Sequence, residues 1–112
     1  MKITMVILLL TALTACSVQL AVPAQSDVDR MSTKYPGYTL AELNGGKTLF
    51  QHTCNRCHKL KNPMSRNEKK WDKIVPKMIG KLNKKEGRVV IDEKQQDSIL
   101  RYIITMNSAK QQ

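Results

Sequence analysis

Three residues near the centre of this 112-residue chain could carry out chemistry together: Cys54, Cys57 and His58. They form the pattern Cys-x-x-Cys-His, which is the attachment motif of c-type haem. One tight turn spans the gap between two vinyl groups on neighbouring pyrroles, so two thiols at this spacing can add across both. The histidine that follows can then ligate the iron as its proximal ligand. The motif therefore predicts one haem c with its iron, covalently bound through Cys54 and Cys57 and ligated by His58.

Two other kinds of site use cysteine pairs, and the surrounding sequence favours neither. A thioredoxin-like redox site expects a strand–helix–strand pattern around Cys-x-x-Cys, which the sequence lacks. A structural zinc site needs four ligands at metal-ligand spacings, and no second Cys/His pair follows. The remaining histidine, His52, is expected to be exposed on a helix. Since the motif occurs once, we expect a one-haem, one-electron module.

The chain is short and strongly basic. Its length indicates one domain, its formal net charge is +10, and only 4% of its residues are aromatic. That is a small supply of large apolar side chains for a stable core. A covalently bound porphyrin would become the largest apolar group in the fold.

Residues 1–15 are typical of an export signal. A short positive start is followed by an apolar run over residues 3–13, which is too short for a permanent bilayer span of about 20 residues. The run ends in Leu13-Thr14-Ala15-Cys16, which looks like a bacterial lipobox. We expect cleavage before Cys16 and lipidation of its sulfur, with ordinary cleavage after Ala24 as the alternative.

Export agrees with the haem motif, because haem c is attached outside the cytoplasm. We expect a lipid-anchored protein on the periplasmic side of a bacterial membrane, and Ser17 after the lipobox favours the outer membrane. Export also excludes nucleic acid as a partner, despite the basic charge. Residues 16–38 lack an apolar period and have the composition of a flexible tether. The predicted domain covers residues 39–108, with a polar tail at 109–112.

Two amphipathic helices are predicted at the ends of this domain. The first begins at Thr39, where Glu42 three residues later completes a capping pattern. Gly45-Gly46 inside this helix indicates that another backbone passes close by. The second begins after Asp92, and its apolar residues recur at i, i+3, i+4 and i+7. They are Ile99, Tyr102, Ile103 and Met106.

Residues 39–107 resemble the small class I cytochromes c. In that family a glycine, an aromatic residue and the first haem cysteine follow one another at intervals of four, as do Gly46, Phe50 and Cys54. The family's C-terminal helix presents an aliphatic and an aromatic residue three apart, which Ile99 and Tyr102 match. The resemblance implies an all-α fold: the N- and C-terminal helices cross, and a middle helical segment lies around one covalent haem.

The middle segment, residues 65–82, has an apolar face formed by Trp71, Ile74, Val75 and Met78. Pro76 should kink or end this helix, and residues 83–87 are predicted as a solvated loop. Tryptophan followed seven residues later by methionine is similar to the distal segment of short bacterial cytochromes c.

The resemblance therefore implies Met78 as the sixth iron ligand. The alternative is that Met78 only fills a gap in the core. By the same resemblance Pro63 lines the proximal side, which puts Met64 on the wrong face. The side chains expected to pack around the haem are Phe50, Pro63, Trp71, Ile99 and Tyr102.

Most of the positive charge falls between residues 56 and 88, with twelve basic residues against three acidic ones. Either these lysines only keep a face solvated, or they form a docking surface for an acidic redox protein. The expected docking residues are Lys69, Lys70, Lys73 and Lys77.

The predicted function is an electron carrier, with no catalytic residues and no small-molecule substrate. Histidine and methionine ligands suit a low-spin haem that transfers single electrons. Alternatives are a haem subunit or domain of a larger oxidoreductase, or a five-coordinate haem peroxidase or gas-binding protein.

Overall fold

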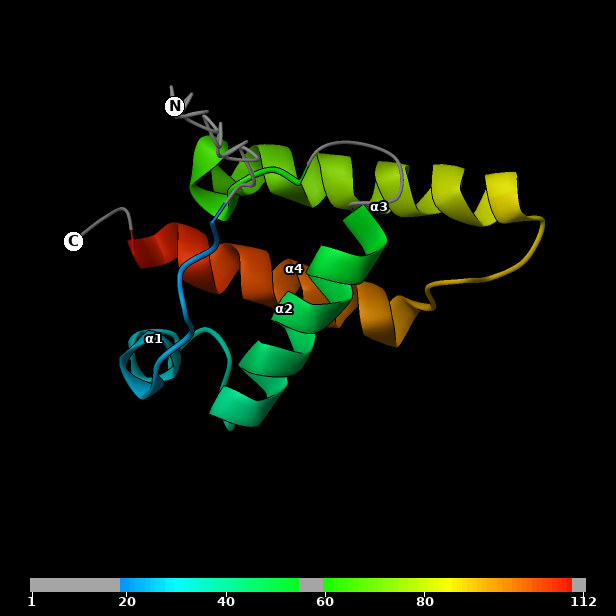
Figure 1. Ribbon diagram of the computed structural model, residues 1–112. Coiled ribbons are helices and arrows are strands. Elements are labelled where there is room, and N and C mark those ends of the chain that lie inside the picture. Colours follow the sequence, from blue (N-terminus) through cyan, green and yellow to red (C-terminus); the bar gives the residue numbers. More distant parts are fainter. Residues whose placement is uncertain (1–18, 55–59, 110–112) are drawn as a thin grey trace, which may run out of the picture.

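The computed structural model describes residues 19–54 and 60–109, and these form an all-α fold (Figure 1). They contain four α-helices, one short 3-10 turn and no strands. The elements are α1 (Gln25–Arg30), α2 (Leu40–Cys54), η1 (Pro63–Ser65), α3 (Glu68–Glu86) and α4 (Glu93–Ser108). The all-α prediction is confirmed for this part of the chain. None of these helices combines the length and apolar character that crossing a membrane requires.

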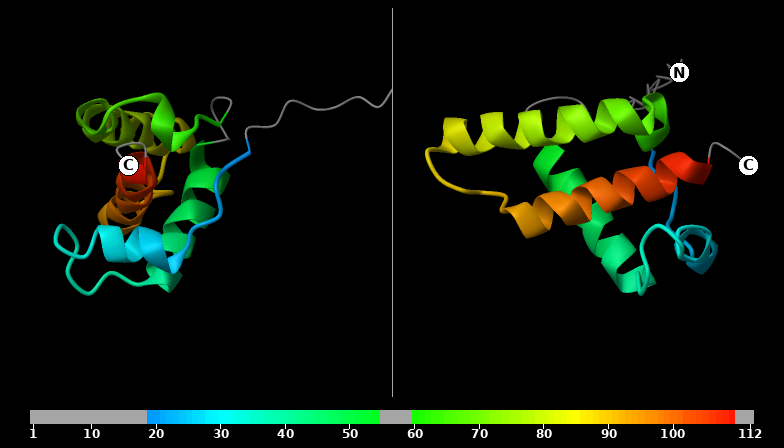
Figure 2. Two further views of the ribbon diagram at one scale, coloured as in Figure 1. Left: turned by 90° about the vertical axis from the view of Figure 1, so that its left-hand side faces the viewer. Right: turned by 180° about the vertical axis from the view of Figure 1, so that it is seen from behind.

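Helix α4 is the element on which the others pack. Helices α3 and α4 run antiparallel, α2 crosses α4 obliquely, and α1 lies on the other side of α4 from α3 (Figures 1 and 2). The predicted stripe of α4 is buried, and Ile99 and Ile103 are fully enclosed. The Phe50 ring of α2 packs on the Tyr102 ring of α4, with 5.4 Å between centroids. This interface is the centre of the core.

Both predicted capping motifs are present. The Thr39 hydroxyl accepts from the Glu42 N–H at 3.1 Å, and the Glu42 carboxylate accepts from the Thr39 N–H at 2.9 Å. Asp92 and Gln95 exchange the same pair of bonds at the start of α4, at 2.8 and 3.0 Å. These bonds satisfy N–H groups that a helix end otherwise leaves unpaired.

Gly46 is where α2 comes closest to α4. A Cβ atom at this position would lie 2.5 Å from the Ser98 carbonyl oxygen and 2.8 Å from the Tyr102 Cβ. The close backbone approach that was predicted for the Gly45-Gly46 pair therefore applies to Gly46. A Cβ at Gly45 would have nothing within 4 Å.

Helix α3 is longer than the sequence predicted. It continues through Pro76 and ends at Gly87, whose φ of 67° is the left-handed conformation typical of a glycine C-cap. Residues 83–86, predicted as loop, form its last turn. Pro76 lies on the exposed face of the helix, while Val75, Ile79 and Leu82 hold the other face in the core. Burial of that face outweighs the cost of the proline.

Part of the predicted tether is also folded. Helix α1 lies within it, and Leu20, Val28 and Met31 are each less than 10% exposed. The segment is held by a few buried apolar side chains and by hydrogen bonds from Arg30 to α4, and such long-range contacts leave no apolar period in the local sequence. The compact unit therefore starts near Leu20 and not at Thr39. Cys16 lies outside the described residues.

Candidate functional site

Two apolar cavities lie side by side between the C-terminal end of α2 and one face of α3. Their volumes are about 290 and 430 Å³, comparable to small-molecule pockets in proteins. The walls of both include Cys54, Trp71, Ile74 and Met78. A shared set of wall residues indicates one site with two lobes.

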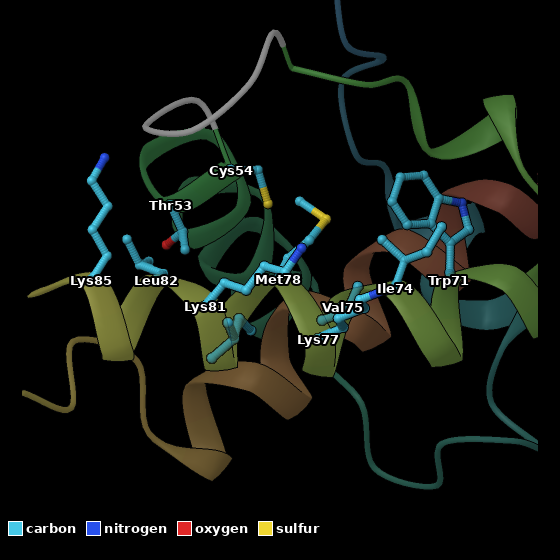
Figure 3. A pocket seen from close by; sticks show the side chains of 11 residues that line it. Thr53, Cys54, Trp71, Ile74, Val75, Lys77, Met78, Lys81, Leu82 and Lys85 are labelled. Carbon is cyan, nitrogen blue, oxygen red and sulfur yellow. The ribbon is translucent and has the colours of Figure 1, made fainter.

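Cys54 is the last residue of α2, and its half-buried side chain forms part of both walls. Met78 comes from α3 and is also half-buried. Figure 3 shows the two sulfur-bearing side chains pointing toward each other across the first cavity. The structure thus brings together two of the residues predicted as haem contacts. The other two, Cys57 and His58, lie outside the described residues.

Trp71 forms a rigid part of the wall. Its indole ring is 2% exposed, and its Nε1–H donates to the Pro63 carbonyl at 2.8 Å. The same carbonyl accepts from the Asn107 amide at 2.9 Å, which links η1 to the end of α4. The Arg66 guanidinium lies 5.5 Å from the centre of the Trp71 ring, within cation–π range. The tryptophan is therefore held by η1 and the residue that follows it, and α4 in turn holds the Pro63 carbonyl that accepts its bond.

Basic side chains border both lobes. Lys61 and Arg66 belong to the wall of the second cavity, and Lys77, Lys81 and Lys85 to that of the first. The three lysines follow one another at i, i+4 and i+8, so they form one row along α3. The site can therefore hold a large apolar group that also carries negative charge at its edge.

The five predicted packing residues occupy two layers. Phe50 and Trp71 line the cavities, whereas Pro63 contacts Trp71 from behind. Tyr102 backs Phe50, and Ile99 is fully buried in the same core cluster. Burial raises the pKa of Tyr102 from its ordinary value of 10.0 to about 12, because the charged phenolate would lose its hydration in the core.

The four predicted docking lysines are exposed on α3, and of these Lys77 also reaches the cavity wall. Sequence reasoning missed the cavity roles of Lys81, Lys85, Lys61 and Arg66. The spacing of Lys77, Lys81 and Lys85 was a usable signal, because it follows the row formed by Ile74, Met78 and Leu82. No comparable pattern marks Lys61 and Arg66.

Within residues 19–54 and 60–109, no three His, Cys, Asp or Glu side chains lie close enough to hold a metal ion. Comparison of the chain with protein-family models, curated proteins and solved structures gives no match.

Proposed function

We propose that this chain is a lipid-anchored, monohaem c-type cytochrome that carries single electrons between redox proteins on the periplasmic side of a bacterial membrane. One observation carries the proposal: the Cys-x-x-Cys-His motif begins at Cys54, at the end of α2, where its side chain lines two adjoining apolar cavities and faces the thioether of Met78.

The described wall residues fit a covalent haem c. Trp71, Ile74 and Phe50 would contact the apolar macrocycle and keep water from it. Lys61 and Arg66 offer two cations for the two haem carboxylates, as charge-assisted hydrogen bonds require. Cys54 and Cys57 would hold the group, and His58 and Met78 would ligate its iron.

Bound by these residues, the group would supply one-electron exchange from a low-spin iron with no substrate bound, and the Met78 thioether would raise its potential. The protein residues then have positional roles. Trp71, fixed by its bond to Pro63, keeps the α3 wall in place, and Met78 supplies a soft sulfur on the side facing Cys54. Helix crossing at Gly46, four residues before Phe50, supports a fold of the class I cytochrome c type.

Replacing Cys54 and Cys57 with alanine tests the attachment. We expect the haem to become extractable by acid and organic solvent, and most of the helicity to be lost with it, because the haem supplies core that the chain lacks. Circular dichroism and the spectrum of the extract measure both effects. A double variant with full helicity would contradict the role of haem as core.

The spectrum also tests the sixth ligand. Met78→Ala should abolish the methionine-to-iron charge-transfer band of the oxidised protein, while Met64→Ala serves as the matched control and should keep it. The opposite result would remove Met78 from the site. A wild-type spectrum without this band would favour the five-coordinate alternatives, a peroxidase or gas-binding protein, and a band kept in both variants would mean that another methionine ligates the iron.

A further inference from the structure

Residues 20–38, here called the strap, are packed onto the domain. Leu20 and Val28 belong to the same buried cluster as Phe50, Trp71 and Ile99. The strap is the blue and cyan segment that leads into α1 beside α4 and then into α2 (Figures 1 and 2). Its position is therefore fixed relative to the candidate haem site.

Arg30 ties the strap to the C-terminal end of α4. Its guanidinium donates to the Ser108 hydroxyl at 2.8 Å and to the Thr105 carbonyl at 3.0 Å. It also forms an ion pair with Asp27 at 2.8 Å, with the two side chains 17% and 12% exposed. A cation at the C-terminal end of a helix interacts favourably with the helix dipole. Because this pair is mostly buried, water competes little for these bonds.

A second set of contacts ties the end of the strap to α3 and α4. Lys34 forms an ion pair with Glu68, the first residue of α3. The Arg101 guanidinium of α4 lies 4.8 Å from the centre of the Tyr35 ring. With Leu20 buried at its start, Arg30 bonded in its middle and Lys34 paired near its end, the strap is held along its length and does not act as a flexible spacer in the folded domain.

The reach of the chain before the strap is limited by covalent geometry. Four peptide units separate Cys16 from Leu20, and an extended chain spans at most about 3.6 Å per residue, so their Cα atoms lie no more than about 14 Å apart. A flexible tether over residues 16–38 would have allowed about 79 Å at full extension.

We propose that the strap is a rigid mount that holds the haem-binding unit against the membrane, and that its redox partner is a protein held at the same membrane. The proposal rests on the proposed lipidation of Cys16. A freely diffusing partner would gain nothing from so short a connection. For a partner in the same membrane, by contrast, the short connection keeps the effective concentration high.

The height of the domain above the lipid tests the mount. The lipidated protein would carry a donor dye at Val89→Cys, a site that is 70% exposed, and vesicles of phosphatidylethanolamine and phosphatidylglycerol would carry acceptor dyes on their headgroups. Arg30→Ala should release the strap and lower energy transfer. Inserting twenty Gly/Ser residues after Gln19 should lower it as well. Ser26→Ala, an exposed change in the same helix, should leave it unchanged.

Hydrogen exchange on the same samples reports the strap directly. The N–H groups of Met31 and Tyr35, bonded to Val28 and Met31, should be protected in the wild type and in Ser26→Ala, and lose protection in Arg30→Ala. If Arg30→Ala loses the protection of these N–H groups but shows the same energy transfer as the wild type, the proposal that the strap is a rigid mount is wrong. If the wild-type protein dissociates from the vesicles, the proposed lipid anchor at Cys16 is wrong, and the mount proposal fails with it. The haem proposal would stand in either case.

The partner is tested by the rate of haem oxidation in vesicles made from the bacterium's own membranes. Effective concentration falls roughly as the −3/2 power of linker length, so extending four residues to twenty-four should slow the reaction about fifteenfold. If the insertion variant keeps its haem spectrum and its haem is oxidised at the wild-type rate, the proposal of a membrane-held partner is wrong. Absence of haem would instead count against the proposed function.

Discussion

Gly46 sets how closely α2 and α4 approach, and this distance positions Phe50 and Cys54 one and two turns further along the same helix. Gly46→Ala would force a Cβ to within 3 Å of the Ser98 carbonyl and Tyr102. Because a backbone atom cannot move aside cheaply, we expect a loss of about 1–3 kcal/mol in the free energy of unfolding. Urea denaturation measures it.

Gly45→Ala is the matched control for that change. Nothing lies within 4 Å of a Cβ at this neighbouring position, so alanine should stabilise the protein by roughly 0.5–1 kcal/mol through its better helix propensity. Equal effects at the two positions would show that helix propensity, and not the crossing, decides the outcome.

Tyr102 makes stability depend on pH in the alkaline range. Burial raises its pKa to about 12, whereas in the unfolded chain it remains near 10. Between these values the folded state keeps a proton that the unfolded state loses. Stability should therefore be fully present below pH 10 and fall as the pH rises toward 12. Urea midpoints measured across this range should fall less steeply in Tyr102→Phe.

Part of the fall of the urea midpoint with pH should remain in Tyr102→Phe, because burial also raises the pKa values of Tyr35 and Tyr38 to about 12. If the urea midpoint falls equally steeply with pH in Tyr102→Phe and in the wild type, Tyr102 ionises without unfolding the core.

At the scale of the elements, α3 is the helix that local propensity describes least well. A proline in a helix interior costs about 3 kcal/mol relative to alanine, mainly through the lost hydrogen bond and a clash with the preceding turn. The buried face of α3 and its caps at Asn67 and Gly87 keep it helical across Pro76. Helix α3 continues because tertiary packing outweighs the local preference.

Pro76→Ala should therefore stabilise the fold by about 1–3 kcal/mol, since it restores an N–H to the helix at an exposed position. The urea midpoint measures the gain. If instead the proline shapes the Met78 segment for iron, the variant should lose the methionine charge-transfer band while gaining stability. If Pro76→Ala changes neither the urea midpoint nor the charge-transfer band, the helix accommodates the proline at no cost in stability.

Local patterns predicted α2 and α4 well because their caps and apolar stripes are complete within the sequence of each helix. Patterns did not predict α1, since the partners of Arg30 lie 75 and 78 residues away. The end of α3 was missed because Lys84, Lys85 and Glu86 carry no apolar signal, although Gly87 marks the stop. At the site, motif spacing singled out Cys54 and the family resemblance singled out Met78, and the facing arrangement of the two side chains was not itself predicted.

At the scale of the whole molecule, positive charge is concentrated on α3. Seven of its nineteen residues are lysines, against three acidic ones, and Glu68 is already paired with Lys34. Several of these lysines border the cavity in which we propose the haem, so the charged face and the redox centre coincide. Such an arrangement can both attract an acidic partner and orient the haem toward it.

Electron transfer to an acidic redox protein should therefore slow as ionic strength rises, because the Debye length falls to about 10 Å near 0.1 M salt. A variant with Lys69, Lys70, Lys73 and Lys77 changed to glutamate should react at least tenfold more slowly at low salt, since steering raises association rates by about 10–10³. Stopped-flow oxidation of the reduced protein measures both effects. Lys94→Glu, exposed at the start of α4, is the control and should change the rate far less than Lys77→Glu. If the electron-transfer rate does not change with ionic strength, or falls equally in Lys77→Glu and Lys94→Glu, the α3 lysines serve only to keep the protein soluble.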